Sequence, residues 1–207
     1  ALAVPGSITD PKFPDRLAKT TVDKLGGMDI IVNNAGYTHD GVIHKMSDEQ
    51  WMAMLDVHLT GPFRLLRAAS LYWREWAKSE IADGKQIMRK VINVSSTSGV
   101  AGNAGQVNYA AGKMGIVGVT KTLAKEWGRY NVNVNAVGFG LIETRMTQPL
   151  GSDGAVAHIG SREISSIQAY AKMLGIVISG TSVRQTIHRR QRPGGSTARA
   201  NAAGIAS

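Results

Sequence analysis

The sequence contains no cysteine, and this absence excludes disulfide bridges and thiolate metal sites. Its five histidines show no spacing typical of metal ligands, so no metal site is predicted. No apolar run approaches the ~20 residues that a membrane-spanning helix needs. No signal peptide is visible, which makes the cytoplasm the expected location. The first residue is not methionine, which suggests a fragment or a processed product.

The net charge of +9 is distributed unevenly along the 207 residues. Residues 175–207 contain five arginines and no acidic residue, so this segment accounts for five of the nine charges. It also lacks hydrophobic periodicity, which predicts a domain over residues 1–174 followed by a basic, disordered tail over 175–207. The tail has no interleaved aromatic residues for stacking on bases, so a solvated tail is favoured over a nucleic-acid-binding arm.

Short apolar runs alternate with longer helical patterns along the first 137 residues. The alternation predicts an α/β fold, with a parallel sheet and helices on both of its faces. Ser47 and Gln50 have the spacing of a capping box at the start of the long second helix, and Gly61-Pro62 is expected to adjust that helix. The expected strands are residues 1–4 (a strand end), 29–32, 90–94 and 132–137, and the expected helices are residues 11–26, 47–82 and 106–129.

Tyr109 and Lys113 are four residues apart in an expected helix, so they share one face. A nearby ammonium group favours the phenolate, and Lys113 is therefore expected to lower the pKa of Tyr109 from its usual ~10. The pair would then be a tuned proton donor. The same spacing also fits two surface residues of a helix.

Polar and glycine-rich clusters directly follow three of the expected strands. They are residues 33–36, 95–96 and 138–140. Ligands of parallel α/β sheets bind beyond the carboxyl ends of the strands, so the clusters predict a binding site there. Taken singly, each cluster is also ordinary turn sequence.

Four motifs occur in an order and spacing that resemble the short-chain dehydrogenase/reductase family. They are NNAG at 33–36, NVSSTSG at 93–99, NYAAGK at 108–113 and VNAVGFGLIET at 134–144, and the resemblance covers roughly residues 1–150. It is nearest to 3-oxoacyl-acyl-carrier-protein reductases. The resemblance implies a Rossmann-like, doubly wound parallel sheet. It also implies an NAD(P)-dependent oxidoreductase that transfers hydride between nicotinamide and a carbonyl or alcohol substrate, such as a 3-oxoacyl thioester. It slightly favours NADP over NAD.

The resemblance also implies roles for individual residues. Tyr109 would exchange a proton with the substrate oxygen, and Lys113 would lower the Tyr109 pKa and bind the nicotinamide ribose. Ser96, thirteen residues before Tyr109, would hold the substrate oxygen as negative charge grows on it. The residues that would lie along the cofactor are Asn34, Ala35 and Gly36, and those at its nicotinamide end are Ile142 and Thr144.

Two residues depart from the family pattern. His58 stands where the family has an asparagine that supports a water of the proton relay. His58 either relays protons itself, which a histidine can do near neutral pH, or bonds to backbone as an ordinary helix histidine. Phe139 replaces the proline of the family's Pro-Gly pair, so it either packs over the cofactor or fills the pocket wall, while Gly140 keeps the backbone freedom.

Larger departures concern whole segments. The sequence has no G-x-G-x-x-G phosphate loop, and the residue that sorts NAD from NADP is absent. By the resemblance, the first strands and the last strand of the sheet are missing, which would leave the strand at 29–33 with an exposed edge. Little or no activity is therefore expected of this chain. The alternative function is a non-catalytic protein that forms homo-oligomers through the helices at 47–82 and 106–129.

Overall fold

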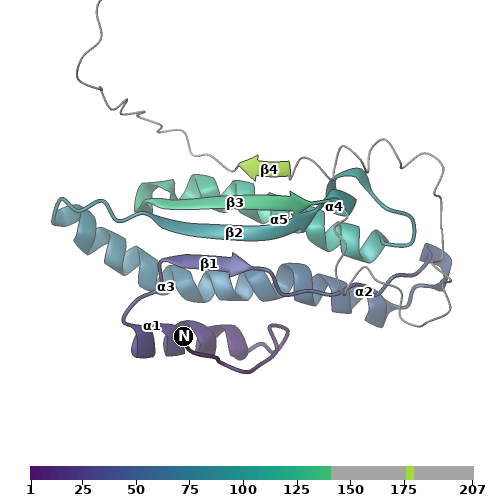
Figure 1. The fold of residues 1–207 in the computed structure, drawn as a ribbon, viewed down its shortest axis with the longest axis horizontal. Coiled ribbons are helices and arrows are strands. Elements are labelled where there is room, and N and C mark those ends of the chain that lie inside the picture. The colour runs from purple at the N-terminus through teal and green to yellow at the C-terminus, as the bar shows by residue number, and fades with distance from the viewer. Residues whose placement is uncertain (141–175, 180–207) are drawn as a thin grey trace, which may run out of the picture.

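A computed structural model describes residues 1–140 and 176–179, and its centre is a four-stranded sheet in the order β1-β2-β3-β4. The first three strands are parallel, with Ile31 opposite Val91 and Val91 opposite Val134, while β4 pairs antiparallel with β3. Figure 1 shows the three parallel arrows pointing to the same edge. The predicted parallel sheet of a Rossmann-like fold is confirmed. The strands are β1 (Ile30–Asn33), β2 (Arg89–Ser96), β3 (Val132–Phe139) and β4 (Ile176–Ser179).

Helices connect the parallel strands, close to where the hydrophobic pattern placed them. The α-helices are α1 (Phe13–Leu25), α2 (Asp48–Leu55), α3 (Gly61–Ala82), α4 (Thr97–Ala101) and α5 (Val107–Trp127). Two 3₁₀ turns, η1 (Ile43–Lys45) and η3 (Gly128–Tyr130), and a π-helical segment, η2 (Asp56–Thr60), complete the described elements. Helix α1 ends at Gly26, whose φ of 77° is in the left-handed region that glycine adopts without strain.

The second helical region begins and bends as the sequence predicted. Ser47 Oγ accepts from the Gln50 backbone N–H at 3.2 Å, and the Gln50 side chain accepts from the Ser47 N–H at 2.9 Å, which is a complete capping box. The helix then widens into η2, where the Gly61 N–H reaches back to the Asp56 carbonyl. Pro62 has no N–H to donate, so regular α-helical bonding is interrupted at this point.

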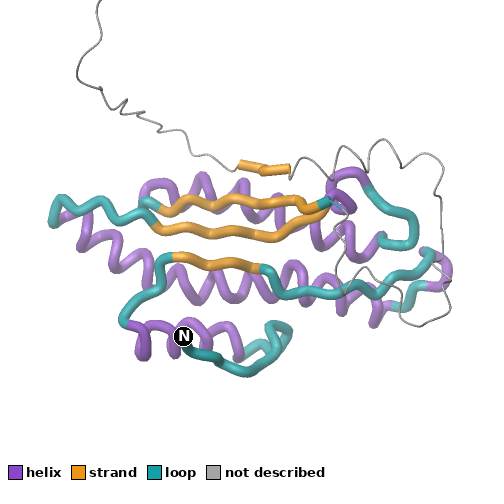
Figure 2. The backbone as a smooth tube through the Cα atoms, viewed as in Figure 1, coloured by secondary structure: helices purple, strands orange, loops and turns teal. Residues whose placement is uncertain are grey.

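The described helices cover only one face of the sheet. Both parallel crossovers, through α3 and through α5, are right-handed turns of the chain and therefore place their helices on the same side, as Figure 2 shows behind the strands. Trp73 of α3 and Trp127 of α5 meet edge-to-face over that side, with ring centroids 5.8 Å apart. On the opposite face Ile30 and Val32 are 59% and 55% exposed. The helices expected on the second face of the doubly wound sheet are not among those of the described residues.

The chain ends differ from the prediction in two further respects. Residues 1–4, expected to be the end of a strand, form no strand in the structure. Residues 176–179 of the predicted disordered tail form β4; the rest of the tail, residue 175 and residues 180–207, lies outside the described residues. The exposed edge expected at 29–33 is present, since β1 pairs with β2 alone within the described sheet. Across the described ranges, no helix is long and apolar enough to cross a membrane.

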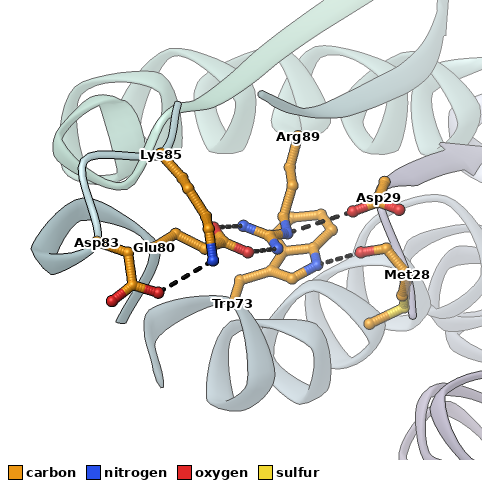
Figure 3. A network of polar contacts seen from close by, with 7 residues as sticks. All are labelled: Met28, Asp29, Trp73, Glu80, Asp83, Lys85 and Arg89. Atoms are coloured by element: carbon orange, nitrogen blue, oxygen red, sulfur yellow. Dashed lines mark hydrogen bonds and ion pairs between the residues drawn. The ribbon is translucent and has the colours of Figure 1, made fainter. Parts of the chain in front are cut away.

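A buried arginine joins the end of α3 to the start of β2 (Figure 3). Arg89 is 3% exposed and donates two hydrogen bonds to the Glu80 carboxylate, at 2.8 and 2.6 Å. Its guanidinium also lies 5.2 Å from the centre of the Trp76 ring. Nearby, Trp73 Nε1 donates to the Met28 carbonyl at 2.6 Å. These contacts fix α3 against the amino-terminal edge of the sheet, at the end opposite the site described next.

Candidate active site

A pocket of about 490 Å³ opens at the carboxyl ends of the three parallel strands. Its walls come from the segment after β1, the β2–α4 junction, the first turns of α5 and the end of β3. These are the segments whose polar clusters predicted a site, so the structure brings together residues that are up to 106 positions apart, from Asn34 to Gly140. The location agrees with the rule that ligands of open parallel sheets bind beyond the carboxyl ends of the strands.

Tyr109 and Ser96 meet at the inner wall of the pocket. Ser96 ends β2 and caps α4, and its Oγ accepts from the Ser98 N–H at 3.1 Å. Tyr109 lies in the first turn of α5, where the buried Asn108 side chain accepts from the Tyr109 N–H at 2.8 Å. Burial raises the pKa of Tyr109, and the neighbouring Ser96 side chain opposes that rise. The phenol is therefore held in its protonated form near neutral pH.

Lys113 lies one turn further along α5 and is only 5% exposed. Its ammonium donates to the Val94 carbonyl at 2.7 Å and lies 5.6 Å from the centre of the Tyr109 ring. Burial lowers the pKa of Lys113 from 10.5 to about 8, because desolvation disfavours the charged form. Ser95 Oγ supports this turn of the helix by donating to the Lys113 carbonyl at 2.7 Å.

The predicted proximity of Tyr109 and Lys113 is confirmed, but the predicted effect on the tyrosine is wrong for the chain alone. The pKa of Tyr109 is raised, with burial as the largest cause and the Asp40 carboxylate as a further cause. The reason is geometric: the Lys113 ammonium bonds to a backbone carbonyl and faces the Tyr109 ring. Helical spacing fixes which residues share a face, but it does not fix which atom a long side chain reaches.

His58 is part of the same cluster. It lies in the π-helical segment η2, is 3% exposed, and its ring stands edge-on to Tyr109 with centroids 4.9 Å apart. Nε2 is 2.7 Å from the Tyr37 carbonyl, so this nitrogen carries the proton and donates it. Burial and the nearby Lys113 charge lower the pKa of His58 from 6.5 to about 4. Of the two readings open from the sequence, these findings favour the backbone-bonded histidine, because His58 does not titrate near neutral pH.

The residues expected along the cofactor lie in the segment after β1. Asn34 and Gly36 line the pocket, and Ala35 is between them but is not part of the lining. A Cβ built on Gly36 would come within 2.3 Å of His58 Cε1, so the absence of a side chain at Gly36 is what lets the histidine ring pack there. Phe139, at the end of β3, is 42% exposed, and together with Gly140 it forms part of the pocket wall. Ile142 and Thr144 lie outside the described residues.

Sequence reasoning missed a set of contacts that hold the segment after β1 against the start of α5. Gln106 Nε2 donates to Asp40 Oδ2 at 2.9 Å, and the Gly41 N–H donates to the Gly105 carbonyl at 2.8 Å. The buried Asn108 side chain donates to the His39 carbonyl at 3.0 Å. The only sequence signal was the position of Gln106 and Asn108 within three residues of Tyr109, and nothing in the sequence joined them to His39 and Asp40.

Comparison with known proteins matches this chain to one family. The family profile described as "short chain dehydrogenase" matches residues 1–155. Over 137 residues the chain is 45% identical to the hydroxyacyl-CoA dehydrogenase ChsB1 of Mycobacterium tuberculosis, covering 66% of this chain and 42% of that protein. It is 40% identical to a 3-oxoacyl-[acyl-carrier-protein] reductase of Synechocystis, covering 74% of this chain and 58% of the reductase.

Solved structures agree with the sequence comparison. The crystal structure of a short chain dehydrogenase from Mycobacterium avium superposes with a TM-score of 0.65 at 39% identity, covering 74% of this chain and 51% of that one. The chain thus spans about half the length of the relatives it matches. The residues that the family profile matches, 1–155, include those that line the pocket.

Proposed function

Because the chain belongs to the short-chain dehydrogenase family, we propose that it carries the catalytic centre of a nicotinamide-dependent oxidoreductase that interconverts a carbonyl compound and an alcohol. The observation that carries the proposal is the convergence of Ser96, Tyr109 and Lys113 on one pocket at the carboxyl ends of parallel strands. Two hydroxyl donors and one buried cation in a pocket of this size suit a reaction in which negative charge develops on an oxygen atom.

The donor set of the pocket fits a nicotinamide cofactor. Asn34 and Gly36 would line its path, and Lys113 would hold a ribose hydroxyl in place of, or beside, the Val94 carbonyl that it now contacts. When bound, the cofactor supplies or accepts the hydride. The resemblance that slightly favours NADP is the only ground for choosing between NADP and NAD.

In the reducing direction, Tyr109 donates its phenolic proton to the substrate oxygen. Its raised pKa keeps that proton in place at neutral pH, so the group is in the correct state before reaction. Ser96 donates a hydrogen bond to the same oxygen and stabilises the charge that grows on it. Lys113 is largely protonated at pH 7, since its pKa is about 8. Its charge would favour the phenolate left by proton transfer once the ammonium turns from the Val94 carbonyl toward the cofactor and Tyr109.

The relatives suggest the substrate class. One is named as a hydroxyacyl-CoA dehydrogenase and others as 3-oxoacyl-[acyl-carrier-protein] reductases. We therefore propose a 3-oxoacyl thioester, or the corresponding 3-hydroxyacyl thioester, as the substrate. The pocket is open to the surface on the side of Asp40 and Asn103, which leaves room for a carrier that remains outside.

Self-association is the second candidate function, as a homo-oligomer that acts with or without catalysis. Large apolar side chains are exposed on the two long helices: Phe63 and Leu71 on α3 are 47% and 66% exposed, and Met114 on α5 is 49% exposed. Exposed apolar groups on long helices favour helix-to-helix docking between copies. Light scattering after size-exclusion chromatography tests this candidate function. At a chain concentration of about 100 μM, on the order of a weak homodimer's dissociation constant, a strict monomer would exclude self-association.

Titration with NADPH and NADH, followed by nicotinamide fluorescence, tests the proposed function. Saturable binding that is lost in Lys113→Ala but retained in Lys121→Ala, an exposed lysine of the same helix, is the expected result. A folded protein that binds neither cofactor at millimolar concentration would contradict the proposal.

A further inference from the structure

Asp40 is fixed at the pocket wall by contacts that the proposed catalysis does not use. Its carboxylate accepts from Gln106 Nε2 at 2.9 Å, and the next residue, Gly41, bonds through its N–H to the Gly105 carbonyl at 2.8 Å. On the other side, the His39 carbonyl accepts from the buried Asn108 side chain at 3.0 Å. Three consecutive residues are thus tied to the segment that leads into Tyr109. The two backbone contacts hold the loop in place, and the Gln106 hydrogen bond orients the carboxylate at the pocket wall.

The charge of Asp40 is not cancelled within the described residues. No ion pair of Asp40 occurs there, and among the described residues that line the pocket only Asp40 and Lys113 are charged. The two charges occupy different environments. Lys113 is buried and bonded to the Val94 carbonyl, whereas Asp40 is exposed on the loop after β1. A substrate that puts its reacting oxygen near Tyr109 and Ser96 shares the pocket with the Asp40 carboxylate.

We propose that Asp40 is a specificity-determining residue: its fixed carboxylate disfavours substrates that carry a negative charge next to the reacting carbonyl, and Gln106 is the positioning residue that holds it there. This inference rests on the proposed function and deepens it. A 3-oxo acid carries a carboxylate two carbons from its ketone, and the corresponding ester or thioester is neutral at that position. The pocket thus selects esterified 3-oxoacyl groups over the free acids. The influence of the Asp40 charge on Tyr109, whose pKa it raises, agrees with a carboxylate close to the reacting atoms.

The test compares two probes of nearly equal size, acetoacetate and methyl acetoacetate. Their dissociation constants are measured by ligand-observed NMR on the full chain, so the readout does not require turnover. The parent chain is expected to bind the ester about fivefold more tightly than the acid, which is the order of effect for two partly solvated charges several ångströms apart. In Asp40→Asn the ratio is expected to fall to within about twofold, and 0.5 M NaCl is expected to reduce the parent's ratio, since salt at about this concentration screens such charges.

Control variants separate charge from shape. Asp40→Glu keeps the charge and is expected to keep the preference, and Gln106→Leu frees the carboxylate and is expected to weaken it. Asp83→Asn removes a carboxylate from the turn between α3 and β2, at the far end of the sheet, and is expected to leave the ratio as in the parent. An Asp40→Asn ratio equal to the parent's, or a folded parent that binds neither probe, would overturn the inference. If the preference follows Asp40 but no hydride transfer occurs, the proposed function fails and the charge selection stands.

Discussion

The ammonium of Lys113 lies 5.6 Å from the centre of the Tyr109 ring while it donates to the Val94 carbonyl at 2.7 Å. The lysine is therefore held beside the tyrosine by the sheet, and its positive charge is buried at a cost in stability. That cost is visible in its pKa of about 8, against 10.5 for the free side chain. Such a buried cation is expected where charge must be stabilised during a reaction. Its burial cost predicts that replacing Lys113 by an apolar residue changes the free energy of unfolding.

Lys113→Met is expected to stabilise the fold at pH 7 by about 1–3 kcal/mol while abolishing catalysis. At pH 7 both folded and unfolded chains hold the lysine proton, so the parent bears the full cost of the buried charge. Between pH 8 and 10.5 the unfolded chain binds more protons than the folded one, so the parent's stability rises with pH and the difference shrinks. Urea denaturation at pH 7 and 9.5 measures this, with exposed Lys121→Met as the control. A variant less stable than the parent at pH 7 would refute the prediction.

His58 predicts loss of stability in acid. Its pKa of about 4 in the folded chain lies below the 6.5 of a free histidine, so between pH 6.5 and 4 the unfolded chain takes up a proton that the folded chain does not. Stability is present above pH 6.5 and falls as the pH drops, by up to about 3 kcal/mol. His58→Asn, which keeps a donor for the Tyr37 carbonyl, is expected to remove this slope. The exposed His44→Asn should keep the parent's slope, and equal slopes in all three proteins would show that His58 is not the cause.

Substitution of the neighbouring serines Ser95 and Ser96 is expected to affect different properties, mainly stability for Ser95 and mainly the reaction rate for Ser96. Ser95 Oγ donates to the Lys113 carbonyl at 2.7 Å and is buried, so Ser95→Ala should cost about 1–2 kcal/mol of stability through the lost hydrogen bond. Ser96 faces the pocket and its Oγ caps α4, so Ser96→Ala should cost about 0.5–1 kcal/mol through the lost cap and lower the rate of hydride transfer by about 100-fold, as removal of an oxyanion donor does. Denaturation and rate measurements on both variants decide this, and the reverse pattern would exchange the two roles.

The buried Arg89 predicts a large effect at a site remote from the pocket. Glu80→Ala removes the carboxylate that accepts two of its hydrogen bonds and leaves the guanidinium with Asp29, 3.6 Å from Nε and 61% exposed. The expected loss is about 2–4 kcal/mol, because an uncompensated buried charge remains. Glu75→Ala, which breaks the exposed pair with Lys78, should leave the stability nearly unchanged. Thermal denaturation compares them, and similar losses in both variants would contradict the assigned role of Arg89.

Much of the fold and the location of the site could be predicted from local sequence. The apolar pattern of residues 90–94, the capping box at Ser47 and the disruption at Gly61-Pro62 each depend on residues close together in the chain, and the structure confirms them. Strand β4 was missed because its four residues are stabilised by pairing with β3, which is distant in sequence. The direction of the Tyr109 pKa and the state of His58 were also beyond local reasoning, because burial controls both.

The most direct measurement is the transfer of deuterium from C4-deuterated NADPH or NADH to methyl acetoacetate at millimolar cofactor, detected by mass spectrometry in the parent and in Tyr109→Phe. Tyr109→Phe keeps the ring that packs against His58 and removes only the phenolic proton donor. Slow transfer by the parent and a loss of about 100-fold or more in Tyr109→Phe is the predicted result, in line with the usual contribution of a general acid. Equal transfer by both proteins, or none by a folded parent that binds cofactor, would contradict a catalytic role for this pocket.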